Sequence, residues 1–213
     1  AYDPDKWNGL ADPKVSVDAG ELVVIGVDGA RFDDALAIIA TSVTTGYQWS
    51  LGIWEKPDGA PDEYEHPLED VDGIMIDAFD HWQVWRVYID PQRIEGLVDR
   101  WQGRWSDKTV IEWRTNRPRP MAHAVRNHVT AVHAGDLRHD GDETFARHIK
   151  NSCKQMVNVN DDKGRQMYVL GKDRPYSPLK MDAGPAAVLS WEARGDAIAA
   201  GAQRRKSGRA AFV

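Results

Sequence analysis

The chain has 213 residues, of which 42% are hydrophobic and 28% charged, a composition that is typical of a globular protein with one sizeable core. Its formal net charge of −6 argues against a free-standing protein that binds nucleic acid tightly, but it leaves room for an enzyme with a local basic patch. The single cysteine, Cys153, excludes an internal disulfide, fits a reducing compartment and is predicted to be a small core residue. No apolar run approaches the ~20 residues that span a bilayer, and no signal peptide is recognisable, so we expect no membrane partner.

The N-terminal part of the chain predicts an arm followed by an antiparallel meander. Residues 1–20 carry two Asp-Pro pairs and several glycines without periodicity, which indicates a linker or N-terminal arm. Three apolar stretches joined by short turns then predict consecutive strands: Leu22–Val27, Ala35–Ala40 and Tyr47–Glu55. The first stretch is rich in β-branched residues and broken only by Gly26, as in a strand that is buried on both faces.

Helical periodicity alternates with short strands in the middle of the chain. A helix is expected over Leu68–Trp82, a strand over Trp85–Asp90, a helix around Ile94–Trp101 and a strand over Lys108–Trp113. A strand–helix–strand passage of this kind implies a parallel pair with a right-handed crossover.

The C-terminal part predicts three helices and a hairpin. One helix follows Met121, and the next carries Phe145, Ile149 and Cys153. A hairpin with its turn at Asn160–Gly164 leads to a final helix from Met181 to about Ala200. We therefore expect one α/β domain over residues 21–201 with a mixed sheet, followed by a basic, mobile tail over residues 202–213.

Carboxylates stand at the ends of two predicted strands and at the start of the last helix. Asp28 follows the first strand, Asp90 ends the strand before Pro91, and Asp182 opens the helix face that carries small residues. Each has an ordinary alternative: a turn residue at Asp28, and helix N-caps at Asp90 and Asp182. Asp34, at the start of the returning strand, is a candidate for a further or outer ligand.

Taken together, these acids point to a metal site. Two adjacent strand ends and an inward-facing helix start would bring Asp28, Asp90 and Asp182 to one edge of the sheet. Hard oxygen ligands suit Mg²⁺ or Mn²⁺, and two such ions ~3.5–4 Å apart can activate water and stabilise the leaving oxygen of a phosphodiester. Asp28 is expected to contact both ions, and the neighbouring Asp33 is expected to serve only the turn.

Four segments in order resemble the nuclease domain of the large terminase subunit of tailed bacteriophages: GVDGARFDDALAI, VYIDPQ, HDGDETFARHIKN and KMDAGPAAVLSWEA. The resemblance covers about Val23 to Gly201. It implies a ribonuclease H-like fold, with a five-stranded mixed sheet flanked by helices and here an extra β-hairpin. It also implies two-metal cleavage of double-stranded, concatemeric viral DNA during genome packaging, with Asp28, Asp90 and Asp182 as the acidic triad and Asp34 at an accompanying acidic position.

The resemblance also implies partners and a location. These are double-stranded DNA, a packaging ATPase domain, the small terminase subunit and the portal protein, in the host cell cytoplasm. The ATPase domain is not in this chain, since no G-x-x-x-x-G-K-[ST] phosphate loop occurs, so we expect either an excised domain or a separately encoded nuclease. Six basic residues in loops near the acids are expected to contact DNA phosphates: Lys180, Arg174, Lys172, Arg114, Arg117 and Arg119.

Two alternatives remain open from the sequence. A Holliday-junction resolvase or a transposase-like nuclease would share the fold and differ in its DNA substrate. A non-catalytic module that binds DNA or the portal would need none of the acids.

Overall fold

The computed structural model describes residues 1–30, 32, 34–61, 63–175 and 177–202. The turn role expected of Asp33 and nearly all of the expected mobile tail therefore lie outside the described residues. Among the residues described, no helix is long and apolar enough to cross a membrane.

A mixed sheet of six strands forms the centre of the domain, in the order β5-β4-β1-β2-β3-β6. The strands are β1 (Leu22–Gly29), β2 (Leu36–Ser42), β3 (Tyr47–Trp54), β4 (Gln83–Ile89), β5 (Val110–Glu112) and β6 (Arg138–His139). Strands β1, β2 and β3 form the predicted antiparallel meander, and β4 pairs in parallel with both β1 and β5. The predicted α/β class with a mixed sheet is thus confirmed, and the expected five strands are joined by β6, a two-residue strand that pairs with the edge of β3.

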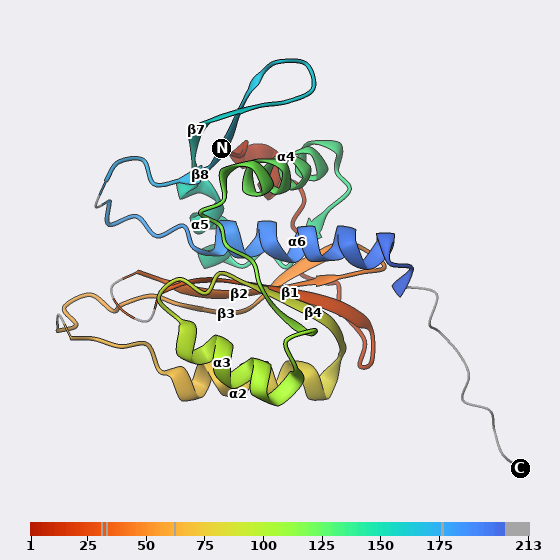
Figure 1. Cartoon of the computed structure of the whole chain (residues 1–213), viewed down its shortest axis with the longest axis vertical. Coiled ribbons are helices and arrows are strands. Elements are labelled where there is room, and N and C mark those ends of the chain that lie inside the picture. Colours follow the sequence, from red (N-terminus) through yellow and green to blue (C-terminus); the bar gives the residue numbers. More distant parts are fainter. Residues whose placement is uncertain (31, 33, 62, 176, 203–213) are drawn as a thin grey trace, which may run out of the picture.

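Helices cover both faces of the sheet (Figure 1). On one face lie α2 (Leu68–His81) and α3 (Glu95–Trp105), packed on a core that includes Ile25, Leu36 and Ile38. The helices of the other face are α4 (Pro118–Ala134), α5 (Glu143–Asn151) and α6 (Ala183–Ala199). Since alternate side chains of a strand point to opposite faces, both faces of the apolar β1 and β2 are buried, as the sequence predicted for β1.

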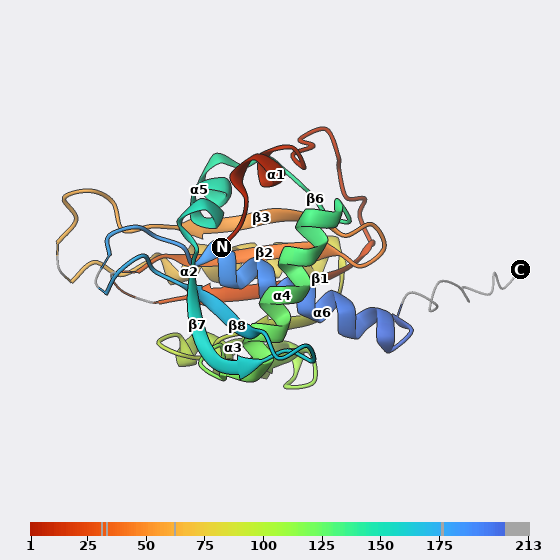
Figure 2. The same cartoon turned by 90° about the horizontal axis from the view of Figure 1, so that it is seen from above.

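The extra hairpin is present, and one end of it differs from the prediction. It consists of β7 (Cys153–Asn160) and β8 (Gln166–Gly171) and packs against α4 (Figure 2). Cys153 opens β7 and is partly exposed, so its expected places in a helix and in the core were both wrong. The helix ends before it because the backbone of Ser152 is extended, and the Ser152 hydroxyl donates to the His148 carbonyl there.

The first residues are folded onto the domain. A short helix, α1 (Pro4–Asn8), buries Trp7, whose ring stacks on that of His139 with 4.1 Å between centroids. The Tyr2 hydroxyl lies 2.7 Å from Nδ1 of the buried His128. Since Nε2 of His128 donates to the Gln48 side-chain carbonyl, Nδ1 is left to accept from Tyr2.

Candidate active site

Two of the predicted acids lie on neighbouring strands. Asp28 stands near the C-terminal end of β1, and Asp90 directly follows β4, which runs parallel to β1. The Asp90 amide donates to the Val27 carbonyl over 3.1 Å, so the strand pairing continues to this point. Both carboxylates therefore emerge at the same edge of the sheet, where the turn between β1 and β2 also lies (Figure 1, left).

The third acid reaches this edge because α6 lies very close to β1. A methyl group at Gly26 would stand 2.0 Å from the Ala186 carbonyl oxygen and 2.4 Å from the Ser190 amide nitrogen, so only glycine allows this approach. Asp182 immediately precedes α6, and its carbonyl accepts from the Ala186 amide over 3.1 Å. The contact at Gly26 thus fixes the distance between Asp182 and the end of β1.

The charge distribution shows that these carboxylates interact. Burial raises the pKa of Asp28 well above its usual value, and the nearby carboxylates of Asp182, Asp90 and Asp34 raise it further. Burial also raises the pKa of Asp182 to about 6, with a second contribution from Asp34. Like charges held together in a poorly solvated place favour the protonated forms unless a cation is present.

The structure decides against the helix-cap alternatives for Asp90 and Asp182. Helix α3 begins only at Glu95, and the Asp90 carboxylate instead accepts from the Gln92 amide at Oδ1 and from Thr115 at Oδ2. Asp182 does occupy the N-cap position of α6, but its side chain makes no capping hydrogen bond and accepts from the Met181 amide. Neither carboxylate is used to begin a helix.

Asp34 is held by two lysines from the segment that leads into α6. Lys172 Nζ lies 2.8 and 3.0 Å from its two carboxylate oxygens, and Lys180 Nζ lies 3.3 Å from one of them. Burial alone would raise the pKa of Asp34, but the hydrogen bonds and charges of the lysines outweigh it and lower the pKa. Asp34 thus holds two of the six predicted DNA-contacting residues at the acidic site. Asp34 itself lies in the turn before β2 and not, as predicted, at the start of that strand.

The four predicted arginines are all exposed. Arg114, 3.6 Å from Glu112, lines a cleft of about 420 Å³ together with Asp90 and Asn116. Arg117 and Arg119 are exposed at the start of α4, and Arg174 is exposed beside Asp173. Sequence reasoning missed Thr115, because a hydroxyl inside a loop carries no periodic signal, and it made no use of the signal at Gly26, a glycine inside a buried strand.

The donor chemistry of the site fits Mg²⁺ or Mn²⁺. Carboxylate oxygens are the ligands that such hard cations prefer, and the raised pKa values mark a place where positive charge would be stabilising. Across the described ranges, however, no group of three or more His, Cys, Asp or Glu side chains is arranged so that it could hold an ion. The acids therefore lie at one edge of the sheet, but their side chains are not arranged as a complete coordination shell.

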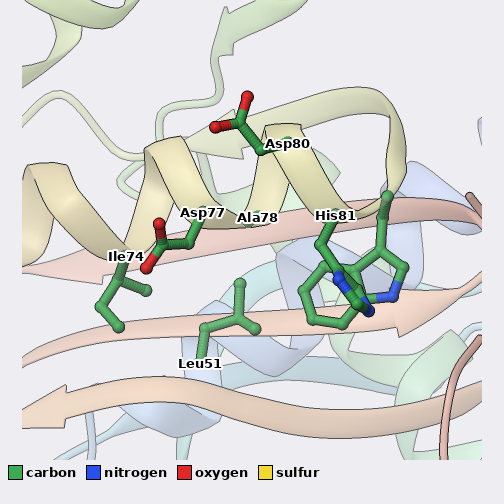
Figure 3. A pocket seen from close by; sticks show the side chains of 7 residues that line it. Leu51, Ile74, Asp77, Ala78, Asp80 and His81 are labelled. Carbon is green, nitrogen blue, oxygen red and sulfur yellow. The ribbon is translucent and has the colours of Figure 1, made fainter. Parts of the chain in front are cut away.

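A separate pocket of about 540 Å³ lies between α2 and β3 (Figure 3). Its apolar lining includes Leu51, Ile74 and Trp82, and α2 contributes Asp77 and Asp80 to it. It contains none of the predicted site residues.

Comparison with known sequences yields two distant relatives. No family model matches the chain. The Gene 13 protein of Mycobacterium phage L5 is 28% identical over an alignment 205 positions long, which covers 91% of this chain and 32% of that protein. The Gene 13 protein of Mycobacterium phage D29 is 26% identical over an alignment 223 positions long, which covers 99% of this chain and 35% of that protein. The chain thus spans about a third of the length of these curated relatives.

Comparison with solved structures reveals the fold. The large terminase nuclease of thermophilic phage G20c matches with a TM-score of 0.60 at 13% identity, over 89% of this chain and 95% of that one. The large terminase of bacteriophage HK97 matches with a TM-score of 0.66 at 13% identity, over 90% of this chain and 43% of that one. A structure of the G20c nuclease with bound magnesium matches with a TM-score of 0.55 at 15% identity, over 89% of this chain and 94% of that one. The predicted ribonuclease H-like architecture is therefore confirmed: this chain has the fold of the nuclease domains of phage large terminases.

Proposed function

We propose that this chain is a metal-dependent endonuclease that cleaves double-stranded viral DNA during genome packaging. The observation that carries the proposal is the convergence of Asp28, Asp90 and Asp182, from two parallel strands and one helix start, at a single edge of the sheet. The fold of terminase nucleases and the magnesium bound by one of them support the same chemistry.

In this proposal Asp28, Asp90 and Asp182 would hold two Mg²⁺ or Mn²⁺ ions. Asp34 would stand outside the set, because its carboxylate already accepts hydrogen bonds from Lys172 and Lys180. When bound, such ions activate water and stabilise the leaving oxygen of a phosphodiester. The protein must supply these carboxylates in their ionised form, and the raised pKa values of Asp28 and Asp182 make that step dependent on pH.

The basic residues around the site would position the duplex without reading its sequence. Arg114, Arg117, Arg119 and Arg174, which are all exposed, would contact phosphates of the duplex. Lys172 and Lys180 are partly exposed beside Asp34, where they would contact a phosphate near the acids.

The proposal extends to partners and location. The HK97 match covers only 43% of that terminase, and a match of similar extent is found with the large terminase of another, thermophilic bacteriophage, whose structure contains ADP. We therefore propose that this nuclease works with a packaging ATPase domain, and with the small terminase subunit and portal protein, in the host cell cytoplasm.

The test is cleavage of supercoiled plasmid DNA in Mg²⁺ or Mn²⁺, with Asp28→Asn as the variant and Asp80→Asn, an exposed acid on α2, as the matched control. Asp28→Asn should lower the cleavage rate more than ~100-fold, since even changes beyond the direct ligands of a metal cost ~10–100-fold. Asp80→Asn should cut like the wild type. Equal cutting by the wild type and Asp28→Asn would refute the assignment.

The same preparations separate the alternatives. A resolvase would cut a four-way junction in preference to linear duplex of the same sequence. A non-catalytic module would bind DNA equally with and without metal, and equally as wild type and Asp28→Asn.

A further inference from the structure

We propose that Thr115 is a positioning residue for Asp90 and that it ties the arginine-bearing segment 114–119 to the metal site. This inference rests on the proposed function. It deepens that function by naming a residue outside the acidic triad that the site requires.

The Asp90 carboxylate is held from two sides. Its Oδ1 accepts from the Gln92 amide at 3.2 Å, within the loop that follows β4. Its Oδ2 accepts from both the amide of Thr115, at 3.3 Å, and the Thr115 hydroxyl, in the loop that follows β5. These loops leave neighbouring parallel strands, and the Trp113 amide still donates to the Ile89 carbonyl over 2.8 Å. The strand pairing therefore brings Thr115 to Asp90 and fixes its backbone there.

This arrangement orients the carboxylate. Only 5% of Asp90 is exposed, so water contributes little to the orientation of its oxygens, and the three donors from Gln92 and Thr115 largely determine it. Threonine is stiff about its first side-chain torsion, so a hydroxyl on a fixed backbone has few positions to sample. Changing a group that orients a metal ligand in this way typically lowers metal affinity or activity by ~10–100-fold.

The position of Thr115 in the chain gives it a second effect. It follows Arg114, which lines the same cleft as Asp90, and it precedes Arg117 at the start of α4. The loop that carries these arginines also holds the carboxylate of Asp90. It would therefore support both a bound DNA phosphate and the metal ligand. Thr115 thus sets the distance between the DNA-contacting segment and the site of cleavage.

The experiment compares Thr115→Val, which keeps the shape but removes the hydroxyl, with Thr115→Ser, which keeps the hydroxyl. Thr130→Val, at an exposed position of α4, is the matched control. Mn²⁺ affinity is measured by titration calorimetry without DNA, and thermal unfolding without metal reports on the fold. Thr115→Val should bind Mn²⁺ ~10–100-fold more weakly, as expected for loss of an outer-shell hydrogen bond, whereas Thr115→Ser and the control should stay near the wild type.

Plasmid cleavage adds a kinetic readout. Thr115→Val should lower kcat at saturating Mn²⁺, and Thr115→Ser should restore it, which a merely structural threonine would not produce. If Thr115→Val does not fold, Thr115→Ala deletes the same hydroxyl and takes its place. If a folded variant without the hydroxyl binds Mn²⁺ and cuts DNA as well as an active wild type does, the proposed role of Thr115 is refuted and the proposed function is not. A wild type that neither binds Mn²⁺ nor cuts overturns the proposed function as well.

Discussion

Asp182 shows how burial tunes a single residue of the site. Its side chain lies before α6 with 8% of the residue exposed, and burial, followed by the charge of Asp34, raises its pKa from 3.8 to about 6. A carboxyl whose folded-state pKa is raised keeps a proton that the unfolded chain has released. Its protonation therefore stabilises the fold below about pH 4, and this stabilisation is lost as the pH rises through about 6.

The consequence can be measured with Asp182→Asn, which imitates the protonated form at every pH. In the absence of metal, the free energy of unfolding of this variant should equal that of the wild type near pH 4. At pH 8 it should be higher than that of the wild type by up to ~3 kcal/mol, since each pKa unit corresponds to ~1.4 kcal/mol. Urea denaturation in a chelator at both pH values tests this, with Asp80→Asn as the control that should stay within ~0.5 kcal/mol of wild type. Equal stabilities of wild type and Asp182→Asn at pH 8 would contradict the raised pKa.

At the scale of elements, the close approach of α6 to β1 determines the site. Ten residues of α6 are buried, most of them small: Ala183, Gly184, Pro185, Ala186, Ala187, Val188, Leu189, Ser190, Ala193 and Ala197. The helix is therefore enclosed by the sheet on one side and by α4 and α5 on the other. Since Asp182 directly precedes α6, any displacement of the helix also displaces the carboxylate.

Gly26→Ala tests this dependence. The new methyl group would overlap the backbone of Ala186 and Ser190, so α6 must shift, and we expect a loss of at least ~3 kcal/mol together with weaker Mn²⁺ binding. Chemical denaturation and calorimetry measure the two effects.

The control is Gly73→Ala on α2, where a methyl group would meet nothing within 4 Å. It should stabilise the protein by ~0.5–1 kcal/mol, because alanine favours the helix over glycine. If Gly26→Ala keeps the stability and metal affinity of the wild type, neither property depends on the close approach of α6 to β1.

At the scale of the whole molecule, charge is distributed unevenly. The chain carries a net charge of −6, yet the segment 114–119 contains Arg114, Arg117 and Arg119, all exposed beside the edge that carries Asp90. A protein that neutralises DNA phosphates releases counterions, so its affinity falls with salt in proportion to the number of phosphates it neutralises. An acidic molecule that binds DNA through one basic segment should therefore show a modest salt slope that depends on that segment.

We predict that replacing Arg114, Arg117 and Arg119 by glutamine weakens binding to duplex DNA. The plot of log affinity against log salt concentration should also become less steep, by up to ~0.9 in slope for each phosphate that is no longer neutralised. Fluorescence anisotropy in a chelator, with Asp28→Asn present in every protein to prevent cutting, measures the slope. The matched control replaces Arg100 and Arg104 of α3, which lie 3.7 and 3.3 Å from Asp72, by glutamine. If both sets of variants keep the wild-type slope, the segment 114–119 does not contact DNA.

Most of the local structure followed from the amino-acid sequence alone. The strands and helices of the core were predictable because apolar periodicity records which face of a segment is buried, and short turns force neighbouring strands to be antiparallel. The same patterns placed Asp28, Asp90 and Asp182 at the ends or starts of elements. Strand β6 could not be predicted in this way, since two residues are too few to show a period.

The contacts that these residues make follow from the folded chain and not from local sequence. Asp34 and Lys172 are separated by 138 positions in the chain, and Asp90 and Thr115 by 25, so no local pattern reveals that their side chains meet. The same holds for the cap alternatives at Asp90 and Asp182, which local sequence leaves open because a carboxylate near a helix start can serve a helix or a distant partner. Hydrogen bonds and charge interactions depend on positions in space, and those are fixed here by the parallel pairing of β1 with β4 and by the contact of α6 with Gly26.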